Sequence, residues 1–311
     1  MSKSKDGETN DLVKLLELYP NEKWCPKHLS SNPNITWEYV QAHPDPPWGK
    51  WNYDCLSKNP NITWDIVQAN PYPSGGRWNY YWLSQNPNIT WDIVQANPHP
   101  PGGEWNYSFG GLSQNPNITW DIVQAHPEKN WCYFTLSLNP NITWDIVQAH
   151  PDPPGGKWNY YNLASNPNIT WEIIRKHPEK GWNSYASSEN PNITLDIVQK
   201  NPDPPGGKWS FYFLAMNPST CWDTVLNNPK IKWRFDALSR NPNITWEIVR
   251  SHPDPPGGKW CFELMSSNKF LCDKTSVRYK KYAKEHFQQA QNVLDICLIK
   301  DVNSIIKRYL Y

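Results

Sequence analysis

Acidic residues recur at one position of this sequence, and clustered carboxylates are residues that could bind a metal or transfer protons. Eight of these acids follow a repeated Trp, as Glu38 follows Thr36-Trp37, and the ninth follows Leu195 at the same position of its repeat. The nine are Glu38, Asp65, Asp92, Asp121, Asp145, Glu172, Asp196, Asp223 and Glu247. A helix capped by the Thr would place this acid in its first turn, where the helix dipole favours an anion. Helix-start electrostatics therefore explain the acids without catalysis or metal binding.

A second position could supply catalytic or metal-binding imidazoles, because His or Asn precedes Pro in every repeat. Its occupants are His43, Asn70, Asn97, His126, His150, His177, Asn201, Asn228 and His252. A catalytic or ligating His would not be replaced by Asn so freely within one chain. The residue before Pro is also pushed out of the helical region, so we interpret these residues as hydrogen-bonding ends of helices.

Other motifs fall short of the chemistry they suggest. Gly155-Gly-Lys157 lacks the spacing of a phosphate-binding loop, and neither a G-x-S-x-G string nor a metal-like Cys/His spacing occurs. Pro44-Asp-Pro-Pro47 formally matches a ligand of SH3-type domains, although stiffening of a repeated loop explains it as well. The sequence thus predicts a non-enzymatic protein with no metal, cofactor or small-molecule substrate.

Composition and charge limit the partners and the compartment. The net charge of +1 gives no general attraction to nucleic acid or anionic lipid, and no apolar run approaches the length of a membrane span. Residues 1–8 lack the apolar region of a secretory signal, and seven cysteines without a C-x-x-C pair suit reduced thiols. Formal glycosylation sequons such as Asn34-Ile-Thr36 are therefore interpreted as turn and cap residues of a cytosolic protein.

The element that must position all of these residues is a repeat built on Asn-Pro-Asn-Ile-Thr-Trp, first seen at residues 32–37. Its Trp sites recur at steps of 27, 27, 29, 24, 27, 24, 27 and 24 residues, with Leu195 in place of one Trp. Such a period indicates a repeat array. Each unit contains two apolar stretches of helical length, separated by Pro-rich turns. We predict an all-α solenoid of about nine to ten two-helix repeats, each of 24 or 27 residues.

The longer repeats carry three extra residues in the loop between their two helices. Variable insertions at one point of a repeat lie on one face of a solenoid, so we expect these loops to line one edge. Their last residues are mostly basic, and two Trp residues fall outside the two repeated Trp positions. The predicted partner-binding residues are Trp48, Lys50, Arg77, Trp82, Lys157, Lys208 and Lys259.

The ends of the chain differ from the repeats. We predict a disordered start at 1–10, a half-repeat that caps the array at 11–31, tandem repeats at 32–268 and a C-terminal helical cap at 269–311. A basic cluster near Arg278 leaves a partner-binding or membrane-surface helix as the alternative for the last segment. Two units are irregular, at 108–111 and 187–195, where a bend or a ligand site competes with drift of the repeat.

The string Asn-Pro-Asn-Ile-Thr-Trp-Asp-Ile-Val-Gln-Ala-Asn-Pro, as at residues 59–71, resembles tandem repeats of giant DNA viruses of amoebae, of the mimivirus and marseillevirus kind. The resemblance covers about residues 20–265. It implies a viral protein made in the host cytoplasm, with packaging in virions as an open alternative. It implies no activity and no functional residues.

Two functions suit a long repeated surface without a catalytic constellation. The first is a scaffold that binds a protein partner, which is the usual role of solenoids. The second is binding of single-stranded RNA or DNA, with bases stacked on aromatic residues and phosphates on the basic loops. The near-neutral net charge disfavours nucleic-acid binding. Binding to nucleic acid would weaken steeply with salt, so a salt titration would separate the two functions.

Overall fold

The computed structural model describes residues 10–255 and 257–268, which belong to a compact unit spanning 1–275; a second unit, 276–311, lies outside the described residues. The described part contains nineteen short α-helices, one 3-10 helix and no strand, which confirms the predicted all-α repeat architecture. None of the described helices is long and apolar enough to cross a membrane. The C-terminal cap predicted at 269–311 cannot be compared with the structure, because it lies outside this part.

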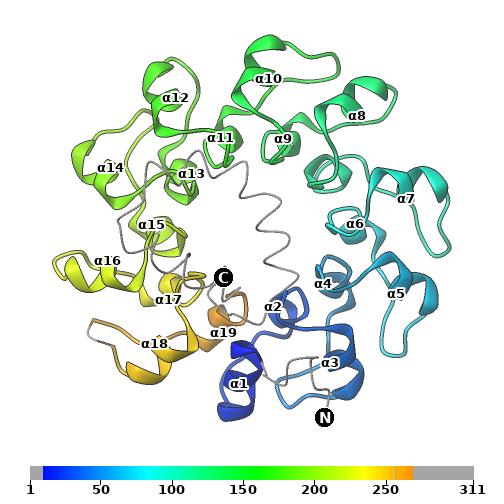
Figure 1. The fold of residues 1–311 in the computed structure, drawn as a ribbon, viewed down its shortest axis with the longest axis horizontal. Coiled ribbons are helices and arrows are strands. Elements are labelled where there is room, and N and C mark those ends of the chain that lie inside the picture. Colours follow the sequence, from blue (N-terminus) through cyan, green and yellow to red (C-terminus); the bar gives the residue numbers. More distant parts are fainter. Residues whose placement is uncertain (1–9, 256, 269–311) are drawn as a thin grey trace, which may run out of the picture. The chain divides into compact units, whose positions relative to one another are not determined.

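The helices alternate between an outer and an inner layer (Figure 1). The outer helices are α1 (Asp11–Leu18), α3 (Trp37–Ala42), α5 (Trp64–Ala69), α7 (Trp91–Ala96), α8 (Trp120–Ala125), α10 (Trp144–Ala149), α12 (Trp171–Lys176), α14 (Leu195–Lys200), α16 (Trp222–Asn227) and α18 (Trp246–Ser251). The inner helices are α2 (Pro26–Ser30), α4 (Tyr53–Ser57), α6 (Tyr80–Leu83), η1 (Leu112–Gln114), α9 (Tyr133–Leu136), α11 (Tyr160–Leu163), α13 (Ser184–Glu189), α15 (Phe211–Met216), α17 (Phe235–Leu238) and α19 (Phe262–Met265). Ten outer helices, each followed by an inner one, make ten repeats.

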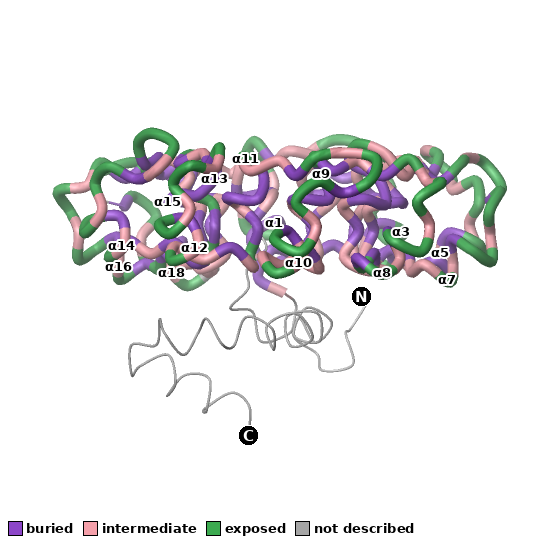
Figure 2. The backbone as a smooth tube through the Cα atoms, turned by 90° about the horizontal axis from the view of Figure 1, so that it is seen from above, coloured by how far each residue is buried: buried purple, intermediate pink, exposed green. Residues whose placement is uncertain are grey.

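Residues 10–268 form a flat ring in which the tenth repeat returns to the first (Figures 1 and 2). Outer helix α1 packs beside α18, although they stand at opposite ends of the array. Buried backbone runs through the interior of the layer and exposed loops lie at its edges (Figure 2). The solenoid is therefore a closed one.

The predicted helix starts and ends are present. The Thr36 hydroxyl caps α3 by accepting a hydrogen bond from the backbone N–H of Tyr39 at 3.2 Å. At the other end of α3, a ring nitrogen of His43 lies 2.9 Å from the carbonyl oxygen of Tyr39. The Asn70 amide makes the equivalent bond in the next repeat, also at 2.9 Å. His and Asn thus serve the same hydrogen-bonding end, as expected from their exchange along the sequence.

The second Trp of each repeat fastens the loop between its two helices. The indole N–H of Trp51 donates to the carbonyl oxygen of His43 at 2.6 Å, across the loop that joins α3 to α4. A loop of the short type is closed in the same way, by Trp182 and His177 at 2.6 Å. The indole position is therefore retained whether or not the three extra residues are present.

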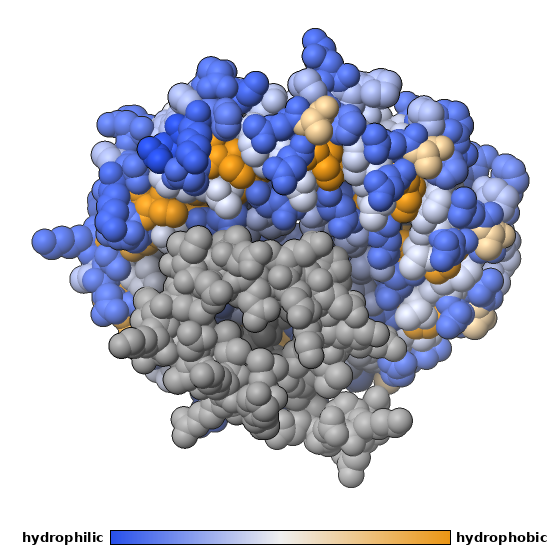
Figure 3. All heavy atoms as spheres, turned by 45° about the horizontal axis from the view of Figure 1, so that its top comes forward, coloured by the Kyte–Doolittle hydropathy of each residue, from blue (hydrophilic) through white to orange (hydrophobic). Residues whose placement is uncertain are grey.

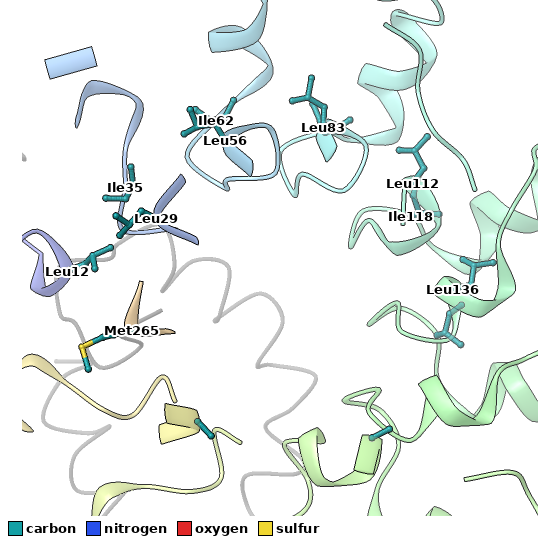
Figure 4. Close-up of a cluster of buried hydrophobic side chains, with 14 of the residues drawn as sticks. Leu12, Leu29, Ile35, Leu56, Ile62, Leu83, Leu112, Ile118, Leu136 and Met265 are labelled. Atoms are coloured by element: carbon teal, nitrogen blue, oxygen red, sulfur yellow. The ribbon is translucent and has the colours of Figure 1, made fainter. Parts of the chain in front are cut away.

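The hydrophobic core follows the ring as two clusters of buried side chains, a large one and a small one formed by Ile193, Val198, Trp209 and Leu214. Most repeats contribute a Leu from the inner helix and an Ile from the following turn, such as Leu56 and Ile62, which are 0% and 1% exposed. These side chains follow one another from repeat to repeat (Figure 4). Helices of four to eight residues are too short to be stable alone, so stacking between neighbours must hold them.

Polar contacts between neighbouring repeats form a buried asparagine ladder, defined by the first Asn of each Asn-Pro-Asn turn or its equivalent. The ladder residues are Asn32, Asn59, Asn86, Asn115, Asn139, Asn166, Asn190, Asn217, Asn241 and Asn268, each at most 2% exposed. The amide of Asn139 is typical, since it donates to three carbonyl oxygens of the preceding repeat at 3.2, 2.9 and 3.1 Å. Buried carbonyl groups need such partners, so the ladder fixes the register between repeats.

The ladder also joins the last repeat to the first. The Asn32 amide donates to the carbonyl oxygens of Ser266 and Asn268 at 2.9 and 2.8 Å. The backbone N–H of Cys25 donates to the Ser266 hydroxyl at 2.9 Å, as the N–H of Asn52 does to Ser30 between neighbours. The seam therefore uses the same bonds as the other interfaces.

Aromatic packing at the seam follows the same rule. The rings of Phe262 and Trp24 are 5.3 Å apart and inclined by 76°. The equivalent pair Tyr80 and Trp105, inside the array, is 5.3 Å apart at 70°. The segment 11–31, expected to cap one end, contacts both its neighbour in sequence and the last repeat. Its role in the ring is that of a full repeat, α1 with α2.

The two irregular repeats keep their places in the ring. The insertion at 108–111 leaves only the 3-10 helix η1 as the inner element of its repeat, and no side chain caps the start of η1. Ser187 and Leu195 are 1% and 8% exposed and occupy core positions. Both departures are absorbed by local packing.

Candidate functional site: an aromatic arc on the inner helices

The loop residues chosen from the sequence are exposed but stand apart from one another. Lys50, Arg77, Lys157, Lys208 and Lys259 each lie in a loop that leads from an outer to an inner helix. The loops that follow α5 and α7 bend toward the outside of the ring (Figure 1). The repeats of the short type interrupt this basic row, and Glu104 replaces the cation in one long loop. Their role in binding stays a prediction.

The two unusual Trp residues have different environments. Trp48 is half-buried and packs edge-on against Trp51, with ring centroids 6.4 Å apart. Its indole N–H is buried and meets no hydrogen-bond partner among the described residues. Trp82 is half-buried on inner helix α6, with the Lys58 ammonium 4.7 Å from its ring centroid. The structure thus separates Trp82, on the inner layer, from the loop residues with which the sequence grouped it.

A set of aromatic side chains that the sequence did not single out lies exposed on the inner layer. Phe109, Phe134, Tyr161, Tyr185 and Phe211 are 58%, 42%, 50%, 51% and 40% exposed. They come from five consecutive repeats, at the first or second residue of an inner helix or, for Phe109, just before η1. We call these five residues the aromatic arc. Exposed apolar residues gathered on neighbouring repeats indicate an interaction site, whereas single exposed residues do not.

Contacts within the inner layer link the first three repeats of the arc. The rings of Phe109 and Phe134 are stacked, with centroids 5.5 Å apart and planes inclined by 28°. The amide of Asn162, beside Tyr161, donates to the carbonyl oxygen of Phe134 at 2.7 Å. The outer helices surround the inner ones (Figure 1). In α9 and α11 the arc residue stands two positions before the buried Leu, about 200° around the helix from it, and so lies on the side away from the core. Hydrophobic residues also appear as separate patches around the visible face (Figure 3).

Charged side chains take the place of the arc in four of the five remaining repeats, and Tyr81 occupies this position in α6. The second residue of α2, α4, α17 and α19 is Lys27, Asp54, Asp236 and Glu263 respectively. Asp236 is paired with Arg234, whose guanidinium lies 2.6 Å away and, with its hydrogen bonds, lowers the pKa of the carboxyl group. The inner layer therefore has an aromatic part and a charged part.

Groups that could bind a metal or react are the other candidates for a site among the described residues. No group of His, Cys, Asp and Glu side chains suitable for a metal occurs in the described part of the chain. Burial raises the pKa of the Cys55 thiol, which makes the reactive thiolate scarcer. A cavity of about 490 Å³ between α16 and α17 is lined by apolar residues and Lys232, without a nucleophile or a carboxylate. Flat aromatic faces remain the groups best placed to engage a ligand.

Comparisons with known proteins give no relative: no family model, curated protein or solved structure matches the chain.

The arc had a signal in the sequence. The position three residues after the second Trp is aromatic in the middle of the array and charged near its two ends. Its occupants are Lys27, Asp54, Tyr81, Ser108, Phe134, Tyr161, Tyr185, Tyr212, Asp236 and Glu263. Such a position can be read as exposed only once the inner helix and its buried neighbours are known. Trp48 and Trp82 stand out more clearly in the sequence, but they do not belong to the arc.

Proposed function

We propose that the protein is a non-enzymatic, ring-shaped scaffold that holds a segment of a partner protein on its inner layer. The observation that carries this proposal is the aromatic arc, five exposed rings on five consecutive repeats. Aromatic residues are enriched in protein interfaces because they remove much apolar surface from water at low entropic cost. The resemblance of the repeat to those of giant DNA viruses of amoebae is the reason to propose a viral role in the host cytoplasm.

Charge supports a protein partner over single-stranded nucleic acid. Stacking of bases on the arc would need cations nearby to hold the phosphates. The loop cations belong to loops between the layers, while the charged inner positions hold one Lys against three acids. This arrangement lacks the electrostatic footprint that nucleic-acid binding normally leaves.

The proposal is tested by selection of peptides from a phage-displayed random library on the immobilised full-length ring. The matched baits are wild type, the triple variant Phe134→Ser/Tyr161→Ser/Tyr185→Ser, and Tyr72→Ser. Tyr72 is a suitable control because it is 72% exposed but lies in an outer loop. We expect the wild type and the Tyr72 variant to enrich the same peptides and the triple variant to lose them.

Circular dichroism first establishes that the three baits are equally folded, since all four changes are at exposed positions. Enrichment that survives in the triple variant, or failure of every bait to enrich a peptide, would refute the arc as a protein-binding site. Salt-sensitive binding of oligouridine by the wild type, lost on Lys157→Glu/Lys208→Glu/Lys259→Glu, would instead establish the nucleic-acid alternative.

A further inference from the structure

The closed seam fixes the geometry of the inner layer. Asn32 meets the last repeat with the same type of amide-to-carbonyl bonds that Asn59 makes to the first. A solenoid that rose along its axis would return to the first repeat out of register, so these bonds require repeats related by rotation alone. Equivalent residues of the inner helices therefore lie on one circle. Phe134, Tyr161, Tyr185 and the four charged residues all stand three residues after the second Trp of their repeat, so they make a collar at one level of the ring.

The number of repeats limits the width inside this collar. Ten inner helices spaced at the usual 8–10 Å span a circumference of about 80–100 Å, or a diameter of roughly 25–32 Å between helix axes. Side chains of the inner helices occupy about 5–6 Å on each side, which leaves at most about 15–20 Å. A folded domain of about 100 residues has a radius of gyration near 13 Å and is too wide. A single α-helix, about 10–12 Å across, fits.

The collar also has two chemically different sides. Phe134, Tyr161 and Tyr185 form the aromatic side, on three consecutive repeats. Asp54 and Glu263 represent the charged side, on repeats that meet around the seam. An amphipathic helix has the same division, with an apolar stripe on one face and charged residues on the other. An extended strand would instead present its side chains alternately to both sides.

We propose that the collar binds one amphipathic α-helix of a partner protein, which enters end-first along the ring axis with its apolar face against the aromatic arc. This inference rests on the proposed function and adds the class of ligand and its direction of entry. Because the ring has no gap among the described repeats, a helix with a free end can enter, whereas one held between two folded domains cannot.

The probe is a fluorescein-labelled amphipathic peptide of about 18 residues, composed of Leu, Ala, Glu and Lys, with Leu on one helical face. A peptide of the same composition, scrambled so that Leu has no common face, is its control. Fluorescence anisotropy with the full chain should give one peptide per ring. The scrambled peptide should bind about tenfold more weakly or worse, as should the amphipathic peptide with the triple arc variant. The Tyr72→Ser ring and a Tyr161→Phe ring should bind like wild type.

Entry is tested with the same peptide placed between two small folded domains, compared with the peptide carrying one domain. We expect the doubly blocked form to lose at least about tenfold in affinity. Equal binding of the two forms would overturn axial entry, and equal binding of the scrambled peptide would overturn recognition of a helix. Library peptides that need the arc for binding but stay non-helical when bound would also overturn the helix proposal. The same result would support the proposed protein-binding function, so failure of one proposal can be told from failure of the other.

Discussion

Replacement of Asn32 by Ala tests whether the ring is closed in solution. In the structure the Asn32 side chain donates to two carbonyl oxygens across the seam, at 2.9 and 2.8 Å, and accepts from the N–H of Asn34 at 2.9 Å. Each neutral bond contributes about 1 kcal/mol net, and a buried group left without a partner costs about 1–3 kcal/mol. We expect Asn32→Ala to lower the free energy of unfolding by about 2–4 kcal/mol.

The matched comparison is Asn139→Ala, inside the array, where the amide makes three inter-repeat bonds and accepts from Asn141 at 2.8 Å. Urea denaturation and calorimetry should show similar losses for both variants, with melting temperatures lower by about 5–15 °C. Asn227→Ala on α16 is the control, because this exposed residue should change stability by no more than about 0.5 kcal/mol.

The two ladder variants separate a closed ring from an open array. In an open array the Asn32 amide would face water, and its removal would cost little. A loss below about 1 kcal/mol for Asn32→Ala, together with the full loss for Asn139→Ala, would refute the closed seam.

Three further predictions concern single repeats. Gly76→Ala should lower the free energy of unfolding by about 1–3 kcal/mol in urea denaturation, because a Cβ there would overlap the ring of a Tyr in the preceding repeat. Gly181→Ala is the control and should be near neutral, because a Cβ at Gly181 meets nothing within 4 Å. Trp158→Phe removes an indole hydrogen bond of 2.6 Å, whereas the buried indole N–H of Trp120 has no partner among the described residues. Trp158→Phe should therefore lower the free energy of unfolding by about 1–3 kcal/mol more than Trp120→Phe does, as measured by thermal unfolding. Burial, and to a lesser extent a nearby Glu, raises the pKa of Tyr39 to about 12. The contribution of Tyr39 to stability is therefore complete below about pH 10, where Tyr39 of the unfolded chain begins to ionise, and is lost as the pH rises toward 12. Tyr39→Phe should make stability less dependent on pH over this range.

The local structure was accessible from the sequence because it depends on neighbouring residues. Thr36 as a cap, Glu38 in the first turn and His43 at the helix end each act within a few residues, and the structure has all three in those places. Ring closure is different, since it depends on the small rotation between adjacent repeats. That rotation arises from side-chain volumes and ladder geometry, and the same repeat pattern is compatible with an open superhelix.

The asparagines illustrate why long-range contacts were missed. Asn-Pro-Asn is typical of turns, and Asn59 does accept from the N–H of Asn61 at 2.8 Å in its own turn. The amide of the same side chain reaches three carbonyl groups 24 to 29 residues away. A turn residue and an inter-repeat contact look the same in the sequence. The arc was missed for a related reason, because its members become neighbours only across repeats.

The closed seam has a consequence for how such a chain can change its length. An open solenoid can gain or lose a repeat at little cost, since each unit contacts only its neighbours. Here ten repeats share a full turn, so each accounts for about 36°, and an added or deleted repeat would alter the angle at every interface. Drift within a repeat is tolerated, as Leu195 in place of Trp shows. The closed ring therefore constrains the number of repeats, and we expect a duplicated repeat to be retained only when another repeat is lost.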